Sequence, residues 1–104
     1  MAFVPNHLSQ NTLSSTITAQ VTGASSKTTY ITEIWLANTG STARTVTLYT
    51  LGTSASNMLA SISVPANGCQ IIQGLKIILN AGEILYAKQD TGTDITMTIY
   101  GGAE

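Results

Sequence analysis

Residues 30–49, YITEIWLANTGSTARTVTLY, constrain the fold more than any other part of the chain. Two apolar-rich segments, residues 28–37 and 43–51, lie on either side of the turn-forming residues 38–41. β-branched and aromatic residues dominate both segments, and a short loop with glycine can close an antiparallel pair of strands. We therefore predict a β-hairpin here. Its first strand carries Trp35 among apolar residues on both faces, which predicts a central position in a sheet.

The composition favours a single all-β domain. The chain has 104 residues, of which 43% are hydrophobic and only 9% are charged, against about 25% charged in an ordinary domain. The polar surface must therefore consist largely of Thr, Ser, Asn, Gln and Gly. Threonine suits the solvent face of a strand because it is both polar and β-branched.

Short apolar or alternating patterns, bounded by turn residues, continue along the rest of the chain. They predict further strands at residues 13–21, 58–64, 69–73, 75–79, 84–89 and 94–101, the last two as a pair. Seven to eight short strands with this spacing predict an antiparallel β-sandwich or jelly roll. We expect an extended N-terminal arm at residues 1–12 and one β-sandwich domain at residues 13–104.

The predicted arm contains the candidate partner-binding residues. It is more apolar than typical disordered sequence, and Pro5 cannot donate a hydrogen bond to a sheet. A frayed terminus and an arm that lies on a neighbouring subunit both fit this pattern. In the second case the contact residues would be Phe3, Val4, Pro5, His7 and Leu8.

Charge and hydropathy argue against several classes of partner. The formal net charge is -1, so the chain cannot neutralise several phosphates, and we expect no binding to nucleic acid. No apolar run is long enough to span a bilayer, and no signal peptide is apparent, so we expect a soluble protein that does not contact membranes. Weak charge also gives little repulsion between copies, which favours assembly with itself or a partner.

No catalytic, cofactor or metal site is expected, and we predict that the protein is not an enzyme. Its one histidine, His7, lies in the predicted arm, far from any nucleophile and acid that could complete a triad. Cys69 is the only cysteine, so an intrachain disulfide is excluded, and we expect it to be a small buried side chain. The sequence Asp90-Thr91-Gly92 resembles the catalytic triplet of retroviral aspartic proteases, but the polar residues before it predict a turn.

Five aromatic side chains leave two interpretations open. They belong to the core and sheet edges, or they form a platform on which sugars or bases stack. These residues are Tyr30, Trp35, Tyr49, Tyr86 and Tyr100.

A family resemblance adds a function to this architecture. It rests on YITEIWLANTG followed by TVTLY, on a PANG turn before a strand, and on LNAGEILYAKQDTGTDITMTIYGG near the end. From Tyr30 to Gly101 the chain resembles small β-sandwich virion structural proteins of tailed bacteriophages. The resemblance implies a homo-oligomeric capsid decoration or cement protein that acts by subunit contact. The alternative is a tail or spike accessory domain that binds host-surface glycan.

The resemblance also implies partners and a location. The partners would be further copies of the chain, as a trimer or another symmetric assembly, and the major capsid or tail protein. The protein would be made in the host bacterial cytoplasm and reside in the virion. We expect contact through apolar strand faces and through the arm.

Overall fold

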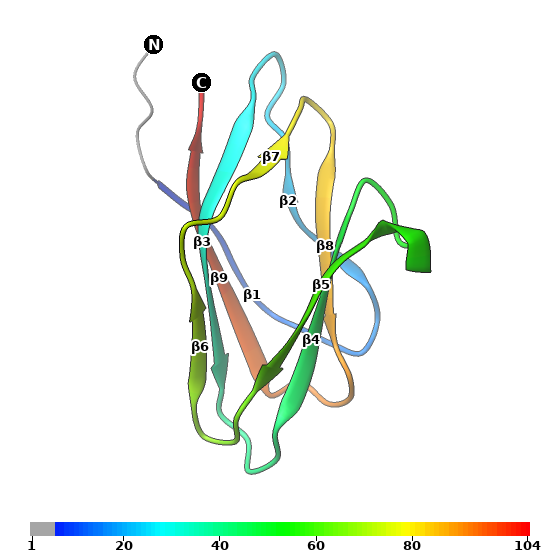
Figure 1. Cartoon of the computed structure of the whole chain (residues 1–104), viewed down its shortest axis with the longest axis vertical. Coiled ribbons are helices and arrows are strands. Elements are labelled where there is room, and N and C mark those ends of the chain that lie inside the picture. Colours follow the sequence, from blue (N-terminus) through cyan, green and yellow to red (C-terminus); the bar gives the residue numbers. More distant parts are fainter. Residues whose placement is uncertain (1–5) are drawn as a thin grey trace.

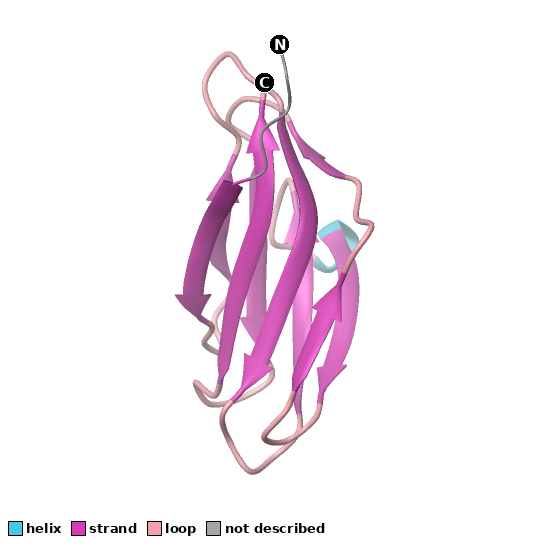
Figure 2. Ribbon diagram, turned by 90° about the vertical axis from the view of Figure 1, so that its left-hand side faces the viewer, coloured by secondary structure: helices cyan, strands magenta, loops and turns pink. Residues whose placement is uncertain are grey.

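In a computed structural model, which describes residues 6–104, the chain is an all-β sandwich of two antiparallel sheets (Figures 1 and 2). This confirms the predicted fold class. A single turn of 3-10 helix, η1 (Ala55–Asn57), precedes the fifth strand. The strands are β1 (Asn6–Thr12), β2 (Thr18–Thr22), β3 (Thr29–Asn38), β4 (Arg44–Thr50), β5 (Met58–Val64), β6 (Cys69–Ile72), β7 (Ile77–Leu79), β8 (Ile84–Gln89) and β9 (Ile95–Ala103).

The order of the strands is that of a jelly roll. Sheet A has the order β1-β9-β3-β6, with β7 also paired to β3, and sheet B has the order β2-β8-β4-β5. β6 and β7 pair with successive parts of β3, so they form one interrupted strand. Counted this way within residues 6–104, the first strand pairs with the last, the second with the next to last, and so on inward to the β4–β5 pair. This nesting defines the jelly roll.

Two predicted hairpins are wrong. β3 occupies the centre of sheet A, as its apolar pattern predicts, but β4 belongs to sheet B. In the same way β8 lies in sheet B and β9 in sheet A, so the two do not pair. The turns were placed correctly, but each one carries the chain across the sandwich to the opposite sheet.

Specific side chains hold these crossing loops. The buried Asn38 amide Nδ2 donates to the carbonyl oxygens of Thr42, at 2.9 Å, and of Val64, at 3.4 Å. Its Oδ1 accepts from the backbone N of Gly40 at 2.9 Å, which tightens the turn. Asn38 thus joins the end of a sheet A strand to the end of a sheet B strand. Local strand patterns contain no information about this bracing.

The N-terminal boundary also differs from the sequence prediction. Residues 6–12, which we expected to belong to an arm, form edge strand β1 and pair with β9 from Asn6 opposite Gly101 to Thr12 opposite Thr96. The next strand begins at Thr18, five residues later than expected. Between them the chain crosses between sheets, with Leu13 fully buried and its N donating to the Ile95 oxygen at 2.8 Å. The alternation through residues 13–17 therefore belongs to a loop.

The core lies between the two sheets. Apolar side chains at alternate positions of both sheets fill it, which is what a strand with one covered face requires. Its buried side chains include Ile31, Ile34 and Leu36 on β3, Ile95, Met97 and Ile99 on β9, and Val46, Leu48 and Leu85 in sheet B. Within residues 6–104, no helix is long and apolar enough to cross a membrane.

Candidate functional site

One long side of the sandwich is left open between edge strands β5 and β6–β7. Figure 1 looks onto this side, with these strands in front and β1 and β2 behind. The three front strands, MLASISV, CQII and IIL, contain no charged residue and no proline. Natural proteins commonly place charged residues and proline on exposed edge strands, because these residues prevent pairing with other chains. β5 has neither kind of residue, whereas the edge formed by β6 and β7 is made of two short strands with Lys76 between them.

Apolar side chains are exposed along this open side, which we define by Leu51, Leu59, Ile62, Ile72, Leu75, Ile77 and Ile78. The exposed fractions of Leu51, Ile78 and Leu59 are 64%, 54% and 47%. Ile62, Ile72, Leu75 and Ile77 are partly buried and pack against the core from its edge. Exposed apolar residues that cluster in this way mark an interaction surface more often than isolated ones do.

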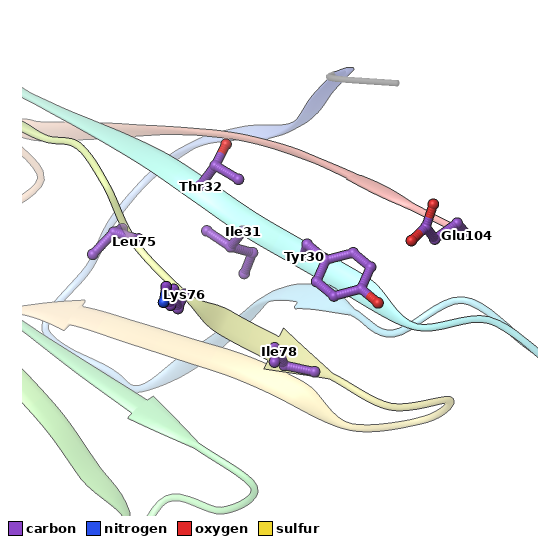
Figure 3. A pocket seen from close by; sticks show the side chains of 7 residues that line it. All are labelled: Tyr30, Ile31, Thr32, Leu75, Lys76, Ile78 and Glu104. Carbon is purple, nitrogen blue, oxygen red and sulfur yellow. The ribbon is translucent and has the colours of Figure 1, made fainter. Parts of the chain in front are cut away.

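Three adjoining hollows shape the open side. The first, of about 460 Å³, lies between Tyr30 on β3, Ile78 on β7 and the C-terminal Glu104 (Figure 3). The second, of about 350 Å³, is lined entirely by apolar residues, among them Leu59, Ile72 and Ile77. The third, of about 360 Å³, lies between Leu51, Leu59 and Ile78. Leu59, Leu75, Lys76, Ile77 and Ile78 each border two of the hollows, so the surface is continuous.

The break between β6 and β7 forms the centre of this surface. Gly74 adopts a positive φ of 70°, which glycine tolerates best, and it turns the chain after β6. The N of Leu75 then donates to the Thr32 oxygen at 3.1 Å, opposite the β-bulge between Ile31 and Glu33. Because of this interruption, residues 75–78 lie on the open side, between the two sheets.

Three charged side chains stand around the hollows. Lys76 borders the first and third hollows, Glu104 borders the first and Glu83 the third. Lys76 forms no ion pair within residues 6–104; the ion pair observed there joins Arg44 to Asp94 at 2.9 Å. The open side therefore combines an apolar centre with charges of both signs.

A second candidate surface is the outer face of sheet A. Trp35 on β3 and Tyr100 on β9 are 42% and 38% exposed, and they sit diagonally across adjacent strands because Glu33 is opposite Tyr100. Glu33 accepts hydrogen bonds from Trp35 Nε1 and, at 3.3 Å, from Gln73 Nε2. The His7 ring lies 5.7 Å from the Tyr100 ring. Aromatic rings here stand beside groups that can form hydrogen bonds.

Two of the five predicted contact residues, His7 and Leu8, lie in the described part of the chain, on β1. Phe3, Val4 and Pro5 lie outside the described residues. His7 is exposed on β1 next to Tyr100, and Leu8 is partly buried and packs against the protein's own core. His7 and Leu8 therefore belong to a strand of the sandwich.

The five aromatics do not form one platform. Tyr30, Trp35 and Tyr100 belong to sheet A, whereas Tyr49 and Tyr86 lie opposite each other in sheet B.

The expectation that Cys69 is buried is wrong. Cys69 is exposed, because β6 is an edge strand and Cys69 lies opposite the exposed Ala37 of β3.

The Asp90-Thr91-Gly92 triplet lies in the turn between β8 and β9, as its polar context predicts. Gly92 has a φ of 77°, and Asp90 Oδ1 accepts from the N of Thr91 at 2.7 Å. Arg44 fastens this loop by donating to Asp94 Oδ2 at 2.9 Å and to Thr91 Oγ1 at 2.6 Å. In the described part of the chain, no three His, Cys, Asp or Glu side chains are grouped so that they could hold a metal ion.

Sequence reasoning missed the open side as a surface. The available signals were the pair Met58-Leu59 and the run from Leu75 to Leu79, both of which place apolar residues at consecutive positions. A one-sided strand cannot bury both of two consecutive apolar residues.

Comparison with known proteins gives no further guide: no protein family, no curated protein and no solved structure matches this chain.

Proposed function

We propose that this protein is a structural component of a bacteriophage particle, a capsid decoration or cement protein that acts by subunit contact and carries out no turnover. The observation that supports this most directly is the open side between β5 and β6–β7, with its exposed apolar centre. Jelly rolls recur among viral capsid domains, which is compatible with the proposal, although this fold also hosts unrelated functions.

The dimensions of the molecule suit a contact of this kind. The principal extents are 44 × 27 × 18 Å, and Figure 1 views the open side down the shortest of them. A standard interface covers roughly 800 Å² on each partner, which fits within a side of this size. Each buried Å² of apolar surface contributes about 25 cal/mol. A particle repeats the contact many times, so modest affinity at each site is sufficient.

The direct test is attachment to capsids. Purified protein should sediment with phage heads that lack it and saturate them at a fixed ratio to the major capsid protein. It should also be found in intact particles by mass spectrometry. If the protein is absent from particles and fails to bind heads, tails or their purified subunits, a structural role in the virion is wrong.

A second function is favoured by the outer face of sheet A. Trp35 and Tyr100, with Glu33 and Gln73 beside them, could stack a sugar ring and bind its hydroxyls, as an accessory domain for host-surface glycan would. Trp35→Ala should then abolish binding on a glycan array while circular dichroism stays unchanged. Thr47→Ala, on sheet B, is the control. The absence of any glycan binding by the wild-type chain would remove this alternative.

A further inference from the structure

We propose that the open side binds the open side of a second copy of this chain, as a two-fold symmetric pair. The inference rests on the proposed function in so far as it names a partner for the same surface. It concerns the isolated protein as well as the particle.

The edges on this side leave apolar side chains without a cover. β5 and β6–β7 end their sheets, and exposed Leu51, Leu59 and Ile78 lie beside them. Lys76, between β6 and β7, is the charged residue of these edges. A chain with a net charge of -1 cannot keep such surfaces apart by repulsion. An exposed edge of this kind associates with other chains unless something specific occupies it.

The charges around the hollows fit a copy of the same surface. Lys76 is the cation, and Glu83 and Glu104 are the carboxylates. In an isologous contact each surface meets its own equivalent, so residue i of one copy meets residue j of the other and the reverse. Lys76 of each copy can then face a carboxylate of the other, and both pairs form at once. Opposite charges that meet in this way fix the register of the contact.

The surface is also large enough for a stable pair. The whole molecule measures 44 by 27 Å in the view of Figure 1, so the roughly 800 Å² per partner of a standard interface would take in the open side together with the strands that border it. Leu59 and Ile78 stand where neighbouring hollows meet, so they are the anchors that a partner surface would enclose.

The first experiment measures self-association. Sedimentation velocity across a wide range of concentrations should show a dimer of the wild-type chain. Leu59→Lys and Ile78→Lys should each weaken it by roughly thirtyfold, as the loss of a central anchor does. Thr45→Lys adds the same charge on the outer face of sheet B and should leave the dimer intact. Circular dichroism and thermal unfolding of each variant verify that it folds.

The second experiment tests the charges across the interface. Lys76→Glu and Glu83→Lys alone should each weaken the dimer about tenfold, because like charges then meet. An equimolar mixture of the two should form a heterodimer close to wild-type affinity, since each cation again faces a carboxylate. If Lys76 instead formed its ion pair with a carboxylate of its own chain, mixing the two variants would not restore association. Glu83 also stabilises its own turn, because its Oε1 accepts from the Asn80 N at 2.8 Å. Glu83→Gln keeps an oxygen acceptor for this bond but removes the charge, so it separates the effect of the turn from the effect of the charge.

The results separate this inference from the proposed function. A wild-type chain that stays monomeric, or a dimer that the Lys variants leave unchanged, overturns the inference. Binding of the same variants to phage heads is measured in parallel. If a monomeric chain binds heads through Leu59 and Ile78, the open side serves the capsid protein, so the second copy is wrong and the virion role stands. A wild-type dimer that is lost in both Lys variants and restored by the mixture supports the inference.

Discussion

At the scale of single residues, close backbone approaches decide which substitutions the fold accepts. Gly101 on β9 lies beside the β3 bulge, and a Cβ at this position would be 1.9 Å from the Tyr30 oxygen. The obstruction is backbone, so it cannot swing aside as the end of a side chain can. Glycine is needed here because β9 and β3 approach closely at Gly101 and Ile31, two residues that are 70 positions apart in the sequence.

Gly101→Ala should therefore destabilise the protein. We expect a loss of about 1–3 kcal/mol of unfolding free energy, because β9 and β3 must separate where Gly101 lies opposite Ile31. Urea denaturation measures it. Thr98→Ala, on the same strand and half-buried, should change stability by no more than about 0.5 kcal/mol. Equal effects of the two substitutions would contradict the role of the close approach.

Gln89 is a second residue whose role depends on the fold. Its side chain is fully buried, Nε2 donates to the Leu13 oxygen at 2.6 Å, and Oε1 accepts from the Asp94 N at 3.3 Å. It joins two loops that cross between the sheets. Gln89→Leu leaves both backbone groups without this partner, so we expect a loss of about 1–3 kcal/mol in thermal or chemical denaturation. The exposed Gln73→Leu should be close to neutral.

At the scale of elements, β1 distinguishes two parts of the N-terminal segment. β1 begins at Asn6, pairs with β9 and carries Leu8 against the core. Residues 1–5, which contain Phe3, Val4 and Pro5, precede it. A truncation that ends within β1 would confuse the loss of a strand with the loss of a contact.

Removing residues 1–5 should leave the unfolding free energy within about 0.5 kcal/mol of the full chain. Removing residues 1–12 should lower it by at least about 2 kcal/mol, because strand pairing and the packing of Leu8 are lost. If Phe3, Val4 and Pro5 contact a neighbouring subunit, the shorter deletion weakens attachment to phage heads. Unchanged attachment by a stable chain without residues 1–5 would refute their role in the contact.

At the scale of the whole molecule, the two sheets share one core and cannot fold independently. Val46 and Leu85 of sheet B are buried in the same cluster as Ile34 and Ile99 of sheet A. We therefore expect one cooperative transition, with far-UV and near-UV circular dichroism changing together. Association through the open side adds a dependence of the melting temperature on protein concentration, which Leu59→Lys should shift to higher concentrations. Separate transitions for the two signals would contradict a shared core.

Much of the secondary structure followed from local sequence. The Thr-rich, β-branched segments predicted strands at β3, β4, β5 and β8 within about two residues, and Asn38 and Pro65-Ala66-Asn67-Gly68 marked real turns. Strand pattern and turn propensity are properties of a few neighbouring residues, so the sequence contains them directly. The scarcity of charged residues likewise follows from composition and predicts a surface that favours contact.

Strand partners and the surface they leave open were decided only by the tertiary structure. A turn between two strands fits a hairpin and a crossing between sheets equally well. In the crossing, the buried Asn38 and Gln89 side chains bond to Val64 and Leu13, which are far from them in the sequence. The jelly-roll order then leaves β5 and β6–β7 at one side, where Leu59 and Ile78 are exposed. An alternating pattern shows that a face is covered, but only the assembled sheets determine which apolar residues remain without a partner.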